Sequence, residues 1–155
     1  MRVIVRSASV LLTVALFASA DAHDDVMQVF SKMAAALTGE GQNGDAGGAR
    51  SGNVAEFMSD VSKDMPDYDT LKTNVTALVR HAEVSSSVDP LTEDAQGNTY
   101  KIDLDWLLQI RSLEQDGPLV RRREVVHCEL RQEKKHWKIV ALMPVDFFAA
   151  VKPGK

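Results

Sequence analysis

Residues 100–111 read YKIDLDWLLQIR and alternate between apolar and polar side chains, with Leu107 as the one exception. A period of two is typical of a β-strand that is buried on one face only. The sequence therefore predicts a half-buried strand whose even-numbered side chains face a core. These side chains are Tyr100, Ile102, Leu104, Trp106, Leu108 and Ile110.

The chain places one more strand before this segment and two after it. Val84, Ser86 and Val88 alternate with Ser85, Ser87 and Asp89, and Pro90 and Gly97-Asn98 predict the turn that follows. Two further segments, Val120–Glu133 and His136–Met143, alternate in the same way. The third strand turns Val126, Cys128 and Leu130 to one face. We therefore expect four consecutive antiparallel strands.

Three helices are predicted before the strands. The first runs from Asp24 to Leu37, since its apolar residues recur at helical spacing. The second starts near Asn53, which forms a capping-box pattern with Glu56, and Pro66 ends it. The third runs from Asp69, the expected N-cap, to His81.

A glycine-rich segment separates the first two helices. Residues 39–52 contain six of the nine glycines of the chain and predict a flexible loop. Helices followed by consecutive strands indicate the α+β class, with helices packed on one face of a curved, mainly antiparallel sheet of about four strands. A single domain over residues 24–148 and a short tail over 149–155 are expected.

The first residues of the chain have the pattern of an export signal. Arg2 and Arg6 precede an apolar stretch, Val10–Phe17, that is too short to span a bilayer. Small residues place cleavage after Ala20 or after Ala22. We therefore expect a signal peptide over residues 1–20 and a secreted or periplasmic protein that has no membrane segment once the signal is removed.

Composition narrows the partners and the redox chemistry. The chain has 18 basic and 22 acidic residues, a net charge of −4, and an acidic domain repels nucleic-acid backbones. Nucleic acid is therefore not expected as a partner. Cys128 is the only cysteine, so no intrachain disulfide can form, and we expect this residue to be buried as a small apolar side chain.

Several of these segments together resemble the nuclear transport factor 2-like superfamily. The resemblance rests on the third helix leading into long strands, on the Trp106 strand, and on the ending WKIV (137–140) followed by PVDFF (144–148). This ending is similar to the closing strand of small exported, uncharacterised members. No short strand is evident between the second and third helices. The resemblance implies a cone-shaped α+β fold that can enclose an apolar cavity.

The superfamily includes isomerases, dehydratases and epoxide hydrolases, and also non-catalytic binding and dimerisation modules. The inward face of the Trp106 strand is apolar apart from the Tyr100 hydroxyl. We therefore predict a non-catalytic module, with no catalytic residue and no cofactor, that binds a small apolar ligand or dimerises through the outer face of its sheet. The residues expected to line the cavity are Phe30, Tyr100, Leu104, Trp106 and Trp137. A packed core with no cavity is the alternative reading of the same residues.

Two other functions remain open. A small lyase or isomerase would use Tyr100, His81 or Asp146 as acid–base groups near the mouth of the cone, where Tyr68 and Asp69 could also lie. A protein-interaction domain would use the charged strand face over residues 121–131.

Two aspartates of the Trp106 strand belong to the outer face. By parity, Asp103 and Asp105 lie opposite the apolar side chains of their strand. Arg121, Arg123 and Arg131 on the neighbouring strand are their expected partners.

Histidine spacing predicts no zinc site, because His81, His127 and His136 lack zinc-ligand spacing with one another or with Cys128. Cleavage after Ala20 would leave Asp21-Ala22-His23 as a free N-terminus, whose amine, amides and imidazole suit square-planar Cu(II) or Ni(II). Cleavage after Ala22 would leave His23 itself at the terminus. An incidental tail is the alternative.

Overall fold

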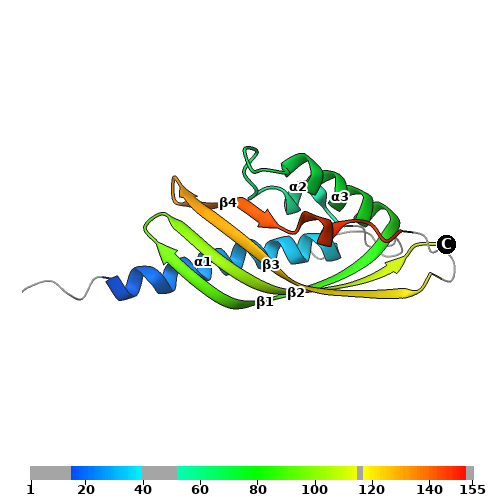
Figure 1. The fold of residues 1–155 in the computed structure, drawn as a ribbon, viewed down its shortest axis with the longest axis horizontal. Coiled ribbons are helices and arrows are strands. Elements are labelled where there is room, and N and C mark those ends of the chain that lie inside the picture. Colours follow the sequence, from blue (N-terminus) through cyan, green and yellow to red (C-terminus); the bar gives the residue numbers. More distant parts are fainter. Residues whose placement is uncertain (1–14, 40–51, 115–116, 153–155) are drawn as a thin grey trace, which may run out of the picture.

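A computed structural model describes residues 15–39, 52–114 and 117–152 of the chain, and it has the α+β architecture that the sequence predicts (Figure 1). Most of the predicted signal peptide, most of the glycine-rich loop and the last three residues lie outside the described residues. Among the described residues, no helix is both long and apolar enough to cross a membrane. The elements in chain order are α1 (Ala15–Thr38), α2 (Val54–Phe57), α3 (Tyr68–His81), β1 (Ala82–Gln96), β2 (Thr99–Ser112), β3 (Leu119–Glu133), β4 (His136–Met143) and the 3₁₀ helix η1 (Val145–Phe148).

The four strands form one antiparallel sheet in the order β1-β2-β3-β4. Two tight turns connect its hairpins: Gly97 takes a positive φ of 59° in the first, and Lys134 and Lys135 take φ values of 47° and 70° in the second. In the second turn, positive φ at both central residues matches the right-handed twist of the flanking strands. The register also shifts once in β1 and once between Glu129 and Leu130 of β3, which bends the sheet.

The predicted end of the first strand at Pro90 is wrong. β1 continues through Pro90 to Gln96, with a bulge between Pro90 and Thr92. β1 lies at the edge of the sheet, where a bulge can absorb a proline that has no N–H to donate. The extension brings a second half of β1 opposite residues 99–103.

The helices differ from the prediction mainly at their ends. α1 begins at Ala15 rather than Asp24, and α2 is a single turn. The side chain of Asn53 caps α2 as predicted, since its Oδ1 accepts a hydrogen bond from the Glu56 N–H at 3.1 Å. Asp67, with a φ of 63°, is the N-cap of α3, so Asp69 lies in the first turn instead.

A short bridge joins the segment after α2 to the sheet. Val61 makes an isolated parallel bridge with Ile139 of β4. The Ser62 N–H donates to the Ile139 carbonyl at 2.8 Å, and the Ile139 N–H donates to the Asp60 carbonyl at 2.8 Å. This pairing between the second and third helices is not predictable from the sequence, because a single bridge has no alternating pattern of side chains.

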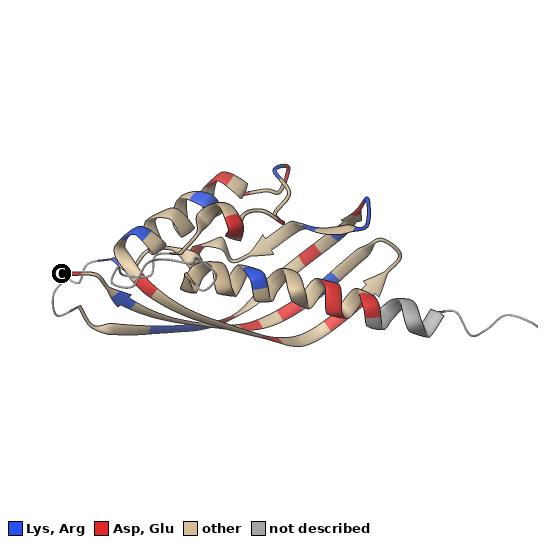
Figure 2. Cartoon of the chain, turned by 180° about the vertical axis from the view of Figure 1, so that it is seen from behind, with Lys and Arg blue, Asp and Glu red and all other residues tan. Residues whose placement is uncertain are grey.

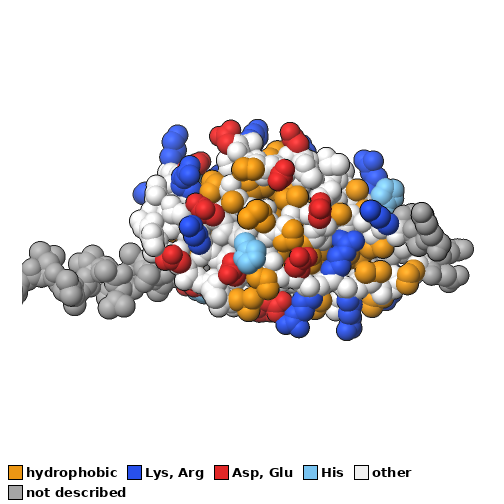
Figure 3. Space-filling view, viewed as in Figure 1, with side chains coloured by type: hydrophobic (Ala, Val, Ile, Leu, Met, Phe, Trp, Pro, Cys, Tyr) orange, Lys and Arg blue, Asp and Glu red, His pale blue; other side chains and the backbone are white. Residues whose placement is uncertain are grey.

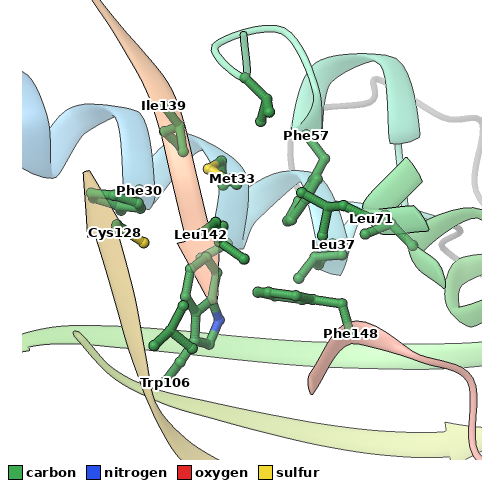
Figure 4. Close-up of a cluster of buried hydrophobic side chains, with 14 of the residues drawn as sticks. Phe30, Met33, Leu37, Phe57, Leu71, Trp106, Cys128, Ile139, Leu142 and Phe148 are labelled. Carbon is green, nitrogen blue, oxygen red and sulfur yellow. The ribbon is translucent and has the colours of Figure 1, made fainter. Parts of the chain in front are cut away.

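The sheet curves around α1, which crosses its inner face, while α2 and α3 lie beyond β4 (Figures 1 and 2). The core fills the space between them, with Trp106 of β2 at its centre (Figure 4). The Trp106 ring packs edge-on against Phe30 of α1 at a centroid distance of 6.3 Å. Its indole N–H donates to the Ser86 hydroxyl of β1 at 2.8 Å, which satisfies the only polar atom of this side chain.

Candidate functional site

The five residues predicted to line a cavity all lie in the packed core. Phe30, Leu104 and Trp106 are fully buried, and Tyr100 and Trp137 are 2% and 6% exposed. The structure brings Phe30 and Trp106 together, and it packs Tyr100 against Trp137 at 5.8 Å in an edge-on pair. Parity along the strand gives the direction of these side chains correctly, but it does not tell whether space remains between them.

Aromatic side chains of η1 occupy the centre of the cone. Phe148 packs edge-on against Trp106 at 5.0 Å and against Phe57 at 5.4 Å (Figure 4). Phe147 packs against Phe148 at 5.0 Å. The sequence predicts the segment PVDFF as the end of the domain without placing it. Its two phenylalanines fill the interior that the resemblance leaves for a cavity.

Two polar side chains hold η1 in this position. Arg122 lies opposite Leu108 and therefore faces inward, and its Nη1 donates to the carbonyls of Phe147, at 3.0 Å, and Ala149. The Asn74 side chain on α3 donates to the Val145 carbonyl at 3.1 Å. Burial lowers the pKa of Arg122, yet a guanidinium stays charged in proteins. The inward parity of Arg122 was a signal in the sequence that strand reasoning overlooked.

A polar cluster closes the end of the cone where the hairpin turns lie. Glu93 of β1 pairs with Ile102, which puts it on the inner face beside Tyr100. Its carboxylate binds the Nδ1 of His23 on α1 at 2.7 Å. Burial raises the pKa of Tyr100 to about 12, and a hydrogen bond with Glu93 and the negative charge of Glu93 add to the shift. The sequence missed Glu93 because β1 was expected to end at Pro90.

Within this cluster, the Tyr100 hydroxyl is poorly matched to acid–base chemistry. An effective general acid or base has a pKa close to the working pH, and a phenol with a pKa of about 12 holds its proton firmly. The structure does not bring the other candidates together with it. His81 and Asp146 are exposed on α3 and η1, while Asp69 is exposed and Tyr68 half-buried in the first turn of α3.

A pocket of about 430 Å³ opens beside this cluster, and Trp137 is the one predicted cavity residue that borders it. Most of its lining is charged or polar, and the Asp60 carboxylate is paired with Lys32 at 2.9 Å. The pocket is therefore unlike the apolar cavity that the sequence predicts. Its lining comprises Asp25, Gln28, Val29, Lys32, Asp60, Lys135, His136 and Trp137.

No metal site is present among the described residues as a group of three or more histidine, cysteine, aspartate or glutamate side chains. His23 lies on α1 with its imidazole bound to Glu93. The copper or nickel site at a processed N-terminus remains a prediction. Cys128 is buried as expected, and burial raises the pKa of its thiol, with a smaller contribution from the charge of Asp103.

On the outer face of the sheet, the predicted partner of Asp105 is correct. The Arg123 guanidinium donates to both carboxylate oxygens, at 2.9 and 3.1 Å from Nε. Asp103, by contrast, pairs with His127 at 2.6 Å and accepts from the Thr92 hydroxyl at 2.8 Å, so the expected arginine partner is wrong for this residue. These hydrogen bonds hold the pKa of Asp103 below its usual range, and Arg123 does the same for Asp105.

Apolar side chains cross the same face between the charged pairs (Figure 3). Met143 is 61% exposed and lies opposite His127, and Val125 is 40% exposed and lies opposite Asp105. Leu107 of β2 and Ala141 of β4 are half-buried on this face. We call these four residues the outer apolar strip: Leu107, Val125, Ala141 and Met143.

No protein-family model matches the sequence, and no curated protein matches it. Solved structures match the fold. A conserved protein from Planctomyces limnophilus DSM 3776 superposes with a TM-score of 0.61 at 7% identity, over 79% of this chain and 94% of its own. The hexachlorocyclohexane dehydrochlorinase LinA-type3 from Novosphingobium barchaimii LL02 gives 0.61 at 10% identity, over 83% and 88%.

A third structure, a protein of unknown function with a cystatin-like fold from Nostoc punctiforme PCC 73102, gives a TM-score of 0.52 at 10% identity, over 77% of this chain and 86% of its own. These neighbours include an enzyme and proteins of unknown function, so they establish architecture and leave chemistry open. The chain thus has the cone-shaped α+β architecture that the nuclear transport factor 2-like proteins share, a fold compatible with ligand binding.

Proposed function

We propose that this domain is a non-catalytic binding module that pairs with a second copy of itself through the outer face of its sheet. One contrast carries the proposal: aromatic side chains pack the interior of the cone, while Val125 and Met143 of the outer apolar strip are exposed to solvent. Exposed apolar groups that lie together on a sheet face are typical of an interface. Covering them removes apolar surface from water, which stabilises the contact by roughly 25 cal/mol per Å² of apolar surface buried.

The charges around the strip are of both signs and alternate along the outer face. Arg111 lies opposite Glu83, and Arg123 binds Asp105. Because neither sign dominates this face, a second copy is not repelled, and a two-fold contact between copies can be self-complementary, as closed dimers require.

Molar mass measured by light scattering after gel filtration tests this proposal. The unaltered protein is expected to elute as a dimer, and Met143→Glu, which places a charge in the strip, is expected to give a monomer. Leu113→Glu is the matched control, because Leu113 is 50% exposed but lies beyond the end of β2. A monomeric unaltered protein at high concentration would refute self-association, as would equal effects of the two variants.

Export from the cell is part of the same proposal. Ala22 packs against the core, and the buried face of α1 follows it from Val26 onward. Cleavage after Ala20 therefore leaves every one of these contacts in the mature protein. The mass of the protein recovered from the medium or periplasm tests this, since an uncleaved chain that stays inside the cell contradicts it.

A further inference from the structure

We infer a second binding site, for a small amphipathic carboxylate, in a pocket of about 700 Å³ between the α2–α3 layer and the end of the β3–β4 hairpin. This volume lies within the range of roughly 300–1,000 Å³ that small-molecule sites occupy. The pocket is separate from the interior of the cone and from the outer apolar strip. Its lining comprises Val54, Ala55, Met58, Ser59, Val61, Ser62, Lys63, Tyr68, Lys72, Thr76, Glu133 and Lys138.

The floor of this pocket is apolar. Met58 and Val61 are 6% and 4% exposed and belong to the core, and Val54 packs partly against the same core. A ligand that lies on this floor buries a hydrocarbon chain or a ring against it. The floor therefore selects a ligand with a substantial apolar part.

The rim of the pocket is positively charged. It carries three lysines against the single carboxylate of Glu133. Lys138 donates to the Ser59 carbonyl at 2.9 Å and lies 4.0 Å from Asp60, so its ammonium already has partners. Lys63 and Lys72 form no hydrogen bond or ion pair through their ammonium groups with any described residue. These two groups are free to bind an anion.

Most of the hydroxyl groups of the lining have partners within the chain. Ser59 donates to the Glu56 carbonyl at 2.8 Å, and Thr76 donates to the Lys72 carbonyl at 2.6 Å. Recognition of the polar end of the ligand is thus left mainly to ammonium groups. An ammonium binds an anion as a point charge, without the two-pronged geometry of arginine. The excess of positive charge on the rim attracts a carboxylate, whereas a cation would be repelled.

Binding of octanoate, followed by ¹⁵N–¹H correlation spectra of the purified full chain, tests the site. Octanoate is expected to produce saturable shifts confined to residues 54–76 and 133–138. Octan-1-ol and octylammonium have the same chain without the negative charge. They are expected to bind at least about tenfold more weakly, since a hydrogen bond to a charged group is worth about 1.5–3 kcal/mol and about 1.4 kcal/mol is tenfold.

Two variants locate the site. Lys72→Glu reverses a rim charge on the exposed side of α3 and is expected to weaken octanoate binding about tenfold or more. Lys101→Glu makes the same charge change at an exposed position of β2 and is expected to leave binding unchanged. Ala55→Trp adds bulk at an exposed position of the lining and is expected to abolish binding without lowering the melting temperature.

Several outcomes would overturn the inference. Shifts that gather around Asp25, Lys32 and Trp137 would assign octanoate to the other pocket. Equal affinity for octanoate and octan-1-ol would show that the lysines do not recognise the carboxylate. Equal weakening by Lys72→Glu and Lys101→Glu would show that only the net charge of the protein affects binding. Non-saturable shifts would mean that no site exists.

Discussion

At the scale of single residues, the core depends on one polar contact. Trp106 is fully buried, and its indole N–H has the Ser86 hydroxyl as its acceptor. A buried donor that loses its acceptor keeps the full cost of leaving water. Ser86 therefore matters more to the fold than its small size and its place in a serine-rich strand suggest.

Ser86→Ala is expected to lower the free energy of unfolding by about 1–3 kcal/mol, because it leaves the indole N–H without a partner. Urea denaturation followed by tryptophan fluorescence measures the loss. Ser87→Ala is the matched control, since Ser87 is exposed on the other face of the same strand. Equal effects of the two substitutions would show that the hydrogen bond contributes nothing particular.

Asp103 provides a dependence of stability on pH. Hydrogen bonds from His127 and Thr92 lower its pKa in the folded state. The pKa of an aspartate in the unfolded chain is about 3.9. A carboxyl whose pKa is lower in the folded state contributes its full stabilisation above that pH, and this stabilisation is lost as the pH falls through the folded-state pKa. Asp103→Asn is therefore expected to lower stability at neutral pH and to flatten its decline below about pH 4.

Urea midpoints measured between neutral pH and acid give this profile. Glu83→Gln, which removes a carboxylate at an exposed position of β1, is expected to keep the profile of the unaltered protein. A profile for Asp103→Asn that declines in acid as steeply as that of the unaltered protein would contradict the assignment.

At the scale of elements, η1 decides whether the cone is hollow or filled. Its backbone carbonyls are held by Arg122 from β3 and, at Val145, by Asn74 from α3. Two side chains that are far from η1 in the sequence thus hold this short segment in place. Its phenylalanines pack on Trp106. The filling of the interior follows from this anchoring.

Arg122→Met is expected to destabilise the protein by about 1–3 kcal/mol, because it leaves the carbonyls of Phe147 and Ala149 without their donor. Arg121→Met is the control, since Arg121 is exposed on the outer face. Denaturant unfolding measures both. The idea that Arg122 anchors η1 fails if both variants unfold at the same urea concentration.

The sequence predicts those elements whose periodicity is long and regular. The Trp106 strand and its neighbours follow from side-chain parity, and the buried face of α1 follows from helical spacing. Glu93 was not predicted to lie on the inner face because Pro90 indicates a turn in the sequence, whereas in the structure a bulge lets the edge strand continue past it. The packing of Phe148 was missed because it depends on Arg122, which lies 26 positions earlier in the chain.

At the scale of the whole molecule, the surfaces with proposed roles are separate. The outer apolar strip lies on the face of the sheet opposite α1, while the larger pocket lies between α2, α3 and the β3–β4 end. Pairing of two copies through the strip would therefore leave that pocket open. The core between the two surfaces consists of apolar side chains, since no polar or charged residue is fully buried among the described ones.

The long edge strand β1 has a consequence for the fate of the protein at high concentration. An unpaired strand edge of 15 residues is a template on which other chains can stack into fibrils. Pro90, the bulge beside it and the acidic Asp89 and Asp94 interrupt this template along its length. The proline and bulge that make the second half of β1 difficult to predict from the sequence thus also protect the folded protein from amyloid-like aggregation.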